Sequence, residues 1–498
     1  MHSASKPLTM NEDYGTLHDL DGGGTTDGGP ANYKTYCSRW LMLALFCGLT
    51  FTNSFLWISF SSIEVFTAQF YEVSPTAVNF LSVIFMIMYV PGSLLTAYYL
   101  SSRGFRFTIV LGALFNVSGA WLRYLSIFVA KSGWIRYGVL FLGQLICAMG
   151  QPFFVNTSAK LAGDWFGASE RDLATVVASL VNPIGNAAGQ ALPPMFVSCG
   201  ETGGSGNKTR TCHRSDQVHG MGSILLLQAV VASLTSGLAF LLFKRAPPTP
   251  PSASAFQRNE IASRPQSGKA MNQVKRDVWA MLQDKQVQRL MVGFGLGLGI
   301  FNALLTVLAQ VLKPVYYDAD GELDKSALSS DAGLYGLILI GSGLVGAGIF
   351  GYLLDVTHAY RMLLKVLFTC SSISMMGFFL SVRPDNHAWI ATLIASSGFF
   401  ALPLLPVALQ SAVECTYPIP EELSSAILVL FGNLVAVGCT FGLQSLLELK
   451  GYGEWDEFES VLTPSFWFVS SIMMVAWASI LSFQGEYKRL HAEAKGIQ

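Results

Sequence analysis

The chain has 498 residues, of which 51% are hydrophobic and only 13% are charged. A soluble domain usually carries about 25% charged residues, so this composition excludes an ordinary soluble protein whose polar surface covers its apolar core. Lysine and arginine (31 residues) nearly balance aspartate and glutamate (32 residues), which excludes the strongly basic surface of a nucleic-acid-binding protein.

The chain begins with a polar, glycine-rich segment, residues 1–39. This segment lacks the basic region and short apolar run of a secretory signal peptide, so we expect no cleaved signal peptide. Its low apolar content and its glycines predict a disordered cytoplasmic tail. Six apolar segments follow, and each is long enough to cross a hydrocarbon core of about 30 Å as a helix. They form a predicted first half, residues 40–243, with spans at residues 40–63, 78–100, 107–130, 134–159, 173–197 and 221–243.

Residues 244–289 interrupt this pattern with a Pro- and Ser-rich opening and many basic side chains, which predicts a cytoplasmic linker. A second half, residues 290–484, and a cytoplasmic tail, residues 485–498, complete the chain. The second half has predicted spans at residues 290–312, 333–354, 362–381, 387–410, 424–447 and 464–483. The order of six helices, a long basic loop and six more predicts an all-α membrane protein. Its twelve transmembrane helices form two six-helix halves, the layout of the major facilitator superfamily fold.

Most lysine and arginine residues lie in the tails, the linker and the turns on one side of the predicted membrane. Positive charge marks the cytoplasmic side, so we expect both termini in the cytoplasm. The loop at residues 198–220 then lies outside. It carries an N-glycosylation sequon at Asn207 and two cysteines, Cys199 and Cys212, that can form a disulfide in an oxidising compartment. Cysteines inside the apolar segments are interpreted as small core residues, without a metal or redox role.

The turn after the second span resembles the charged latch of the superfamily, Gly-x-x-x-Asp-Arg-x-Gly-Arg, in a degenerate form. Ser101 replaces the aspartate, whereas Gly104 and Arg106 persist. In the second half, Gly351 and Asp355 keep the glycine and the aspartate at the same offset, the expected trace of an internal repeat. The alternative is a solvated turn with chance spacing. The predicted gating residues are Arg103, Gly104, Arg106, Asp355, Arg361 and Glu414.

Polar side chains deep in lipid cost free energy and usually face a cavity. The candidates near the span midpoints are Asn53, Trp57, Gln151, Asn182, Asn302 and Asn433. This neutral set of amides and an aromatic ring suits a neutral solute or a delocalised cation held over the ring of Trp57. For each residue, the alternative is a hydrogen bond between helices. No carboxylate or histidine is placed centrally in a span, which favours facilitated diffusion or exchange over proton symport.

Four stretches carry a family resemblance: residues 53–58, 143–151, 165–170 and 412–418. They resemble the feline leukaemia virus subgroup C receptor-related transporters, in the same helices and the same order, over nearly the whole membrane part. The resemblance implies a carrier of haem or of choline and ethanolamine, and in a neighbouring branch a lysosomal vitamin carrier.

In the choline-handling members of this family, a helix 1 tryptophan packs on the quaternary ammonium, and Trp57 matches it. The run before Ala303, which includes Phe301, also fits. Family glutamines fall on Pro183 and Asn433, however, and a family tyrosine falls on Asn302. The chain therefore resembles a less characterised branch more closely than the receptor members, and the resemblance implies the fold more firmly than the substrate.

These observations lead to one main functional hypothesis, the alternating-access transport of a small organic solute by a monomeric carrier. We expect no cofactor, no metal and no nucleic-acid partner, and we expect the plasma membrane rather than a lysosome or vacuole. One alternative is a receptor or sensor that keeps a transporter fold without turnover. Another is a membrane-embedded enzyme, which needs a buried cluster of His, Asp, Glu or Cys that the spans lack.

Overall fold

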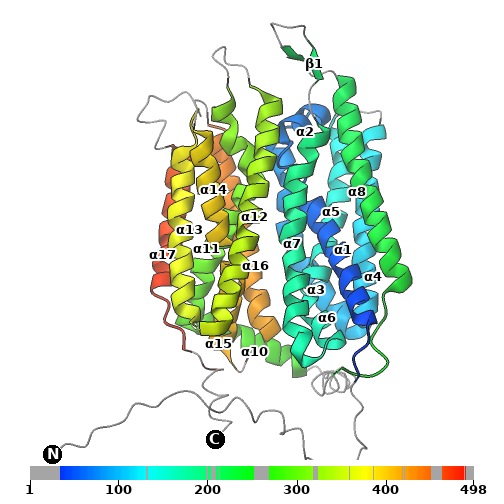
Figure 1. The fold of residues 1–498 in the computed structure, drawn as a ribbon, viewed down its shortest axis with the longest axis vertical. Coiled ribbons are helices and arrows are strands. Elements are labelled where there is room, and N and C mark those ends of the chain that lie inside the picture. Colours follow the sequence, from blue (N-terminus) through cyan, green and yellow to red (C-terminus); the bar gives the residue numbers. More distant parts are fainter. Residues whose placement is uncertain are drawn as a thin grey trace, which may run out of the picture.

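The structure is a computed structural model. Its described residues are 34–129, 133–197, 200–202, 209–211, 214–251, 269–317, 323–357, 359–384, 386–417, 419, 421–449, 463–486 and 488. Long helices stand side by side in two bundles (Figure 1). The first bundle contains α1 (Ser38–Ile58), α3 (Pro75–Ser102), α4 (Phe105–Leu125), α5 (Gly133–Val155), α7 (Ala168–Phe196) and α8 (Arg214–Leu242). The second contains α11 (Lys285–Leu312), α12 (Lys325–Thr357), α13 (Tyr360–Ser381), α14 (His387–Ala401), α15 (Leu404–Thr416), α16 (Glu421–Leu447) and α17 (Pro464–Leu481).

Shorter elements lie at the two ends of these bundles (Figure 1). At one end, named here the α2 end, are α2 (Glu64–Tyr71), η1 (Ser126–Phe128), η2 (Lys313–Tyr316) and the antiparallel strands β1 (Gly200–Thr202) and β2 (Thr209–Thr211). At the opposite end, the α10 end, are α6 (Ser158–Trp165) and α10 (Lys269–Gln283). Helix α1 starts and α17 finishes at the α10 end. There Lys488 forms an ion pair with Asp284, at the start of α11, with 3.6 Å between nitrogen and oxygen.

Eleven helices of the described chain are long and apolar enough to cross a membrane. The two helices α14 and α15 count as one of them, because Leu402 and Pro403 only bend the chain between them. Helix α7 is the remaining candidate for a twelfth span. It has 29 residues, but prolines and amides such as Asn182 and Gln190 lower its hydropathy. Its length suits a span. Because α7 packs against α12 of the second bundle, part of its surface faces protein instead of lipid and can be polar.

Local sequence signals place several helix ends. Ser74 and Thr463 are hydroxyl N-caps followed by a proline at the first helical position, and each accepts a backbone N–H bond from its own helix, α3 or α17. The carboxylate of Asp284 caps α11 in the same way. Gly104 joins α3 to α4 with a φ of 84°, a left-handed conformation that glycine adopts without strain.

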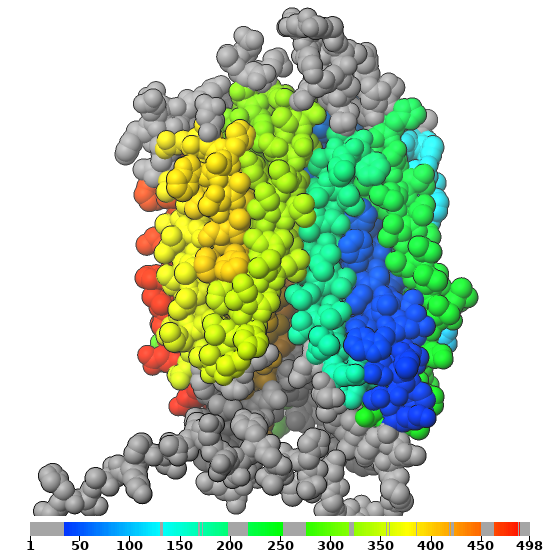
Figure 2. Space-filling view, in the orientation of Figure 1, coloured from blue at the N-terminus to red at the C-terminus, as the bar shows by residue number. Residues whose placement is uncertain are grey.

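The two halves meet along the helix pairs α7 with α12 and α3 with α16. Figures 1 and 2 show α12 and α7 side by side along the face in view. Glycines on α12 permit this approach. A Cβ atom at Gly333 would lie 2.7 Å from the carbonyl oxygen of Gln190, and one at Gly336 would lie 2.8 Å from the Gln190 side chain. The outward surface carries exposed apolar side chains such as Leu94, Met195 and Met362, as expected of helices that face lipid.

The structure differs from the expected boundaries at three places. Helix α1 ends at Ile58, and turns lead to the separate helix α2, although the apolar sequence continues to Ile63. The predicted linker contains the amphipathic helix α10, and α11 begins at Lys285. The predicted span at residues 387–410 consists of α14 and α15, because Pro403 removes a backbone donor at the break.

Candidate substrate site between the two halves

The first helix of the first half is broken close to the α2 end. Helix α1 stops at Ile58, so its last carbonyl groups need partners from outside the helix. Arg123 of α4 donates to the carbonyl of Leu56 at 3.0 Å, and Gln144 of α5 donates to the carbonyls of Leu56 and Trp57 at 3.4 and 3.2 Å. A cation is favourable at a helix C-terminus. These two side chains therefore hold the end of α1 in place beside Trp57.

Arg123 is completely buried, at 0% exposure. Besides Leu56, it donates to the hydroxyl of Ser59 and the amide oxygen of Gln228, both at 2.9 Å, and its guanidinium lies 4.8 Å from the Phe60 ring centroid. Its donors are thus directed at neutral groups around the end of α1. This arrangement makes Arg123 a structural cap, and we do not assign it to binding an anionic solute.

The first helix of the second half is also distorted near the same end. Val307 of α11 has non-helical dihedral angles (φ −107°, ψ 17°). The kink leaves carbonyl groups free to accept bonds from the first half. Ser61 donates to the carbonyls of Leu305 and Thr306 at 2.6 and 2.8 Å, and Gln190 of α7 donates to Leu305 at 2.9 Å. The turn after α1 and helix α7 therefore both contact the kinked part of α11.

Further polar contacts join the halves at the α2 end. Glu64, only 1% exposed, forms an ion pair with Lys313 of η2 at 3.4 Å and accepts a bond from Gln310 at 3.4 Å. The other contacts are Ser329 to the Ser62 carbonyl (2.6 Å), Lys325 to Gln69 (3.4 Å) and Thr76 to Glu448 (2.8 Å). These contacts close the α2 end of the interface between the halves.

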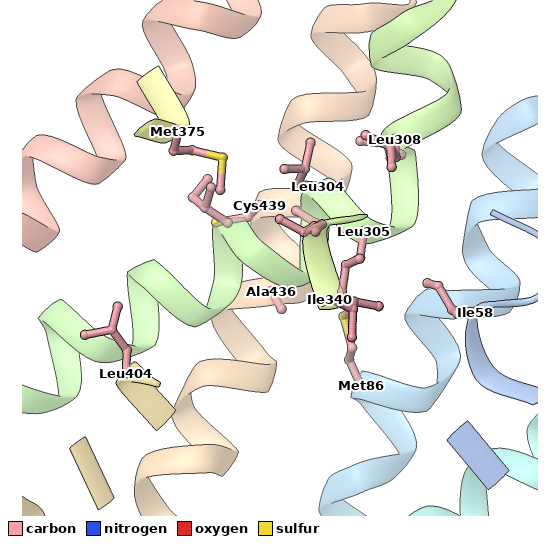
Figure 3. Close-up of a cluster of buried hydrophobic side chains, with 14 of the residues drawn as sticks. Ile58, Met86, Leu304, Leu305, Leu308, Ile340, Met375, Leu404, Ala436 and Cys439 are labelled. Carbon is pink, nitrogen blue, oxygen red and sulfur yellow. The ribbon is translucent and has the colours of Figure 1, made fainter. Parts of the chain in front are cut away.

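An apolar cluster lies directly next to this polar closure. Figure 3 shows Ile58 and Met86 of the first half converging on Leu304, Leu305 and Ile340 of the second. All five side chains are at most 2% exposed. Apolar packing across the interface excludes water, so the cluster strengthens the closure.

Trp57 follows on the α10 side of this cluster, together with residues of α11. Its side chain is 6% exposed, its indole N–H donates to the Ser82 carbonyl at 3.0 Å, and its ring lies 6.5 Å from that of Phe85. Asn302 is 8% exposed, and within the described chain its amide has no hydrogen-bond partner. Phe301 beside it is half-buried. We name Trp57, Phe301 and Asn302 the upper tier of the predicted substrate-binding residues.

The other predicted amides lie nearer the α10 end. Gln151 follows Gln144 by seven residues along α5, and Gln144 contacts Trp57, so Gln151 lies ~10 Å below that level. Asn433 follows Gly432, whose Cβ position lies 2.6 Å from the Leu298 side chain. This contact places Asn433 roughly one helical turn below Asn302.

Asn182 precedes Gln190 by eight residues on α7, so it lies ~12 Å on the α10 side of the contact between Gln190 and Leu305. We name Gln151, Asn182 and Asn433 the lower tier. It accepts a weak bond from Asn186 of the same helix at 3.5 Å. About two turns of helix thus separate the levels of Trp57 and Gln151, so the predicted residues are spread along the bundle axis.

Asn53 does not join these residues. It is 1% exposed, and its amide donates to Asn116 of α4 at 2.7 Å and to the Cys147 carbonyl of α5 at 3.0 Å. The structure therefore places it in a contact between helices, the alternative considered from the sequence, and we leave it out of the proposed site. Residues that the sequence did not single out are Ser61, Gln144 and Lys313. Their partners at the closure include backbone carbonyls, which carry no sequence signal.

The predicted gating residues lie at the α10 end. Arg103 caps α3 and lies 5.8 Å from the Phe107 ring, Arg106 donates to the Phe240 carbonyl at 3.4 Å, and Gly104 lies near Arg245. These contacts all lie within the first half and the start of the linker.

In the second half, Glu414 is buried in α15, and Arg361 lies at the start of α13. Asp355 belongs to α12, but its side chain lies outside the described set. Asn207, Cys199 and Cys212 are also outside the described residues.

A family model described as Major Facilitator Superfamily matches residues 45–443. The chain is 28% identical over 481 residues to "Solute carrier family 49 member A3" of Xenopus tropicalis, covering 94% of this chain and 92% of the relative. It is 31% identical over 408 residues to "Choline/ethanolamine transporter FLVCR1" of Mus musculus, covering 80% and 68%.

Among solved structures, the crystal structure of a D-xylose-proton symporter matches with a TM-score of 0.65 and 14% identity, over 91% of this chain and 99% of the symporter. At this identity the likeness concerns the fold alone, and it covers both halves. The chain therefore belongs to the major facilitator superfamily, in the family of the feline leukaemia virus subgroup C receptor-related transporters.

Proposed function

We propose that the protein carries a small organic amine, of the choline or ethanolamine class, by alternating access through the cleft between its halves. Its superfamily and fold are those of transporters rather than enzymes. The observation that carries the proposal is the closure at the α2 end, where Ser61, in the turn after α1, donates to two carbonyls at the kink of α11. In this state the solute would exchange with the α10 side.

The proposed site combines aromatic rings with neutral amides. Trp57 and Phe301 offer ring faces to a quaternary or primary ammonium group, a contact worth about 2 kcal/mol or more when it is shielded from water. Asn302 supplies an amide without a partner among the described residues, which can bind a hydroxyl or ammonium group of the solute. The mouse relative named as a choline/ethanolamine transporter supports this class of substrate.

The lower tier suits passage more than tight binding. Gln151, Asn182 and Asn433 lie at successive levels toward the α10 end, and in the proposed path their neutral amides can replace water around a moving solute. None of these groups titrates near neutral pH, so we infer facilitated diffusion or exchange without a proton-binding group at the site.

The proposed orientation places the α10 end, with both chain termini, in the cytoplasm and the α2 end outside. The excess of basic residues in the linker and in the turns at the α10 end supports it. We further propose a monomer in the plasma membrane, with a glycan on Asn207 and a disulfide between Cys199 and Cys212 in the loop at the α2 end. Haem and a vitamin are the alternative substrates, and the experiment below tests both.

The test is uptake of radiolabelled choline, ethanolamine, haem and pyridoxine by the purified protein in liposomes. We expect saturable uptake of choline or ethanolamine, with Trp57→Ala reducing the uptake at least tenfold. Trp467→Ala serves as the control, because Trp467 is 57% exposed on the outer face of α17. Absence of uptake of both amines would refute the proposed substrate class, and a Trp57→Ala variant with full uptake would remove Trp57 from the site.

A further inference from the structure

The chain contains three Ser-Pro or Thr-Pro dipeptides, at Ser74, Thr249 and Thr463. This dipeptide is the minimal acceptor of proline-directed protein kinases. Two of the three hydroxyls are occupied in helix caps. The Ser74 side chain accepts from the N–H of Ala77 at 3.3 Å, and that of Thr463 accepts from the N–H of Phe466 at 3.2 Å.

Thr249 lies in a different environment. It follows α8 in a segment that is neither helix nor strand, between two pairs of prolines at residues 247–248 and 250–251. A residue that precedes proline is kept away from the helical conformation, so this segment suits the extended binding cleft of a kinase. Thr249 is half-exposed at the α10 end of the molecule.

The hydroxyl of Thr249 has a long-range partner. It shares a hydrogen bond of 3.2 Å with the phenol of Tyr36, which precedes α1. A Cβ atom at Gly167 would lie 3.5 Å from Thr35 and 4.0 Å from the Pro251 carbonyl. The segment before α1, the turn before α7 and the start of the linker therefore pack together, and the bond between Tyr36 and Thr249 fastens the linker to the start of α1.

We propose that Thr249 is a phosphorylation site for a proline-directed kinase, and that its phosphate releases the linker from Tyr36. In this step the Thr249 oxygen forms a bond to the γ-phosphorus of ATP and the bond from that phosphorus to the ADP oxygen breaks. ADP leaves, and the hydroxyl proton passes to a carboxylate of the kinase. In cells the site rests on the proposed cytoplasmic orientation of the α10 end.

Two cationic side chains, Lys34 and Arg39, lie near Tyr36 and would attract a phosphate on Thr249. A phosphothreonine adds about −1.5 to −2 charges. Lys34 lies with its ammonium nitrogen 5.7 Å from the Tyr36 ring centroid, and Arg39 donates to the Tyr36 carbonyl at 3.1 Å. Arg39 also pairs with Glu170 at 2.8 Å, which joins the starts of α1 and α7. The phosphate competes with Glu170 for Arg39, and thus loosens the anchor of α1 at this end.

The experiment uses the full-length protein in lipid nanodiscs, where both faces are accessible, with a purified mitogen-activated protein kinase and labelled ATP. We expect phosphate on Thr249, its loss in Thr249→Ala and its retention in Thr249→Ser. Ser74 and Thr463 provide internal controls, because their caps should keep them unmodified. Tyr36→Phe should be phosphorylated several-fold faster, since the Thr249 hydroxyl is no longer held.

Two results would overturn the proposal. The first is a protein without phosphate at Thr249 under conditions in which the kinase fully modifies a standard peptide. The second is phosphate on Ser74 or Thr463 at the same rate as on Thr249, which would show that structure does not select the site. An unchanged rate in Tyr36→Phe, measured on a monodisperse protein, would reject the restraint by Tyr36. Phosphate incorporation does not depend on transport, so this outcome is separate from the proposed function.

Discussion

The ion pair between Glu64 and Lys313 offers a quantitative test of the closure at the α2 end. We predict that Lys313→Met shifts the protein toward a state open at that end. In the closed state the variant leaves the carboxylate of Glu64 buried at 1% exposure without its cation. In the open state this carboxylate is hydrated. Loss of the lysine therefore destabilises the open state much less than the closed state.

The magnitude follows from the geometry. At the observed 3.4 Å, the Coulomb attraction is about 5 kcal/mol at an effective dielectric constant of about 20. Breaking a fully buried pair costs about 3–5 kcal/mol. Because the Lys313 side chain is 23% exposed, we reduce the expected net effect to about 2 kcal/mol, which changes the ratio of open to closed protein about 30-fold.

The assay is the rate of maleimide labelling of a cysteine at Ser62, which is 1% exposed in the closure, in a protein whose native cysteines are replaced. Lys313→Met should label about 30-fold faster than the parent. Glu64→Gln should change the rate much less, because it removes the buried charge and keeps a group for Gln310. The double variant should resemble Glu64→Gln, and Lys325→Met, at an exposed contact, should match the parent.

Two patterns would refute this reasoning. An unchanged labelling rate in Lys313→Met would mean that the pair does not hold the α2 end closed. A larger increase in Glu64→Gln than in Lys313→Met would mean that loss of the carboxylate, and not its uncompensated burial, weakens the closure.

Three further predictions concern residues of the bundle. Arg123→Lys should lower the free energy of unfolding by about 2 kcal/mol, measured by thermal or denaturant unfolding in detergent, because one ammonium cannot reproduce the fork of donors; an unchanged stability would contradict the capping role. Gly185→Ala should strongly reduce the yield of folded protein, since its Cβ would lie 2.6 Å from the Phe51 carbonyl, whereas Gly438→Ala, with nothing within 4 Å, should fold normally; equal yields would contradict the close packing. Asn53→Ala should lower thermal stability and leave the KM for uptake unchanged, whereas Asn302→Ala should raise the KM and leave thermal stability unchanged. A raised KM in Asn53→Ala would show that Asn53 belongs to the substrate site.

Much of the fold is predictable from the sequence because a membrane span demands about 20 consecutive helical residues of suitable polarity. Helix α7 illustrates the limit of hydropathy alone. Its amides and prolines keep it below the usual level, and it is recognisable from its length and its place between two clear spans. The amphipathic helix α10 was missed, because in a basic linker its apolar side chains are too few to stand out.

The candidate site was less predictable. Asn53 and Trp57 lie one turn apart on α1 and look equivalent in the sequence. Only the packing of α4 and α5 against this helix shows that the Asn53 amide is bonded to Asn116 and to the Cys147 carbonyl. The indole N–H of Trp57 instead donates to the Ser82 carbonyl of α3. The break after Ile58 was hidden by the apolar residues that continue to Ile63. The bonds that Ser61 and Gln190 make go to backbone carbonyls exposed by a kink, and a kink of this kind has no signature in side-chain types.

The central claim is that transport requires the halves to separate at the α2 end. Cysteines replacing Ser62 and Ser329, whose residues bond directly at 2.6 Å, should form a cross-link in a protein without other cysteines. A second pair at Ser374 and Ser396, which touch within one half at 2.7 Å, controls for the cross-linking chemistry. We predict that cross-linking the first pair stops amine uptake into proteoliposomes and that a reductant restores it, while the second pair has no effect. Full uptake through a protein cross-linked between Ser62 and Ser329 would contradict alternating access by these two halves.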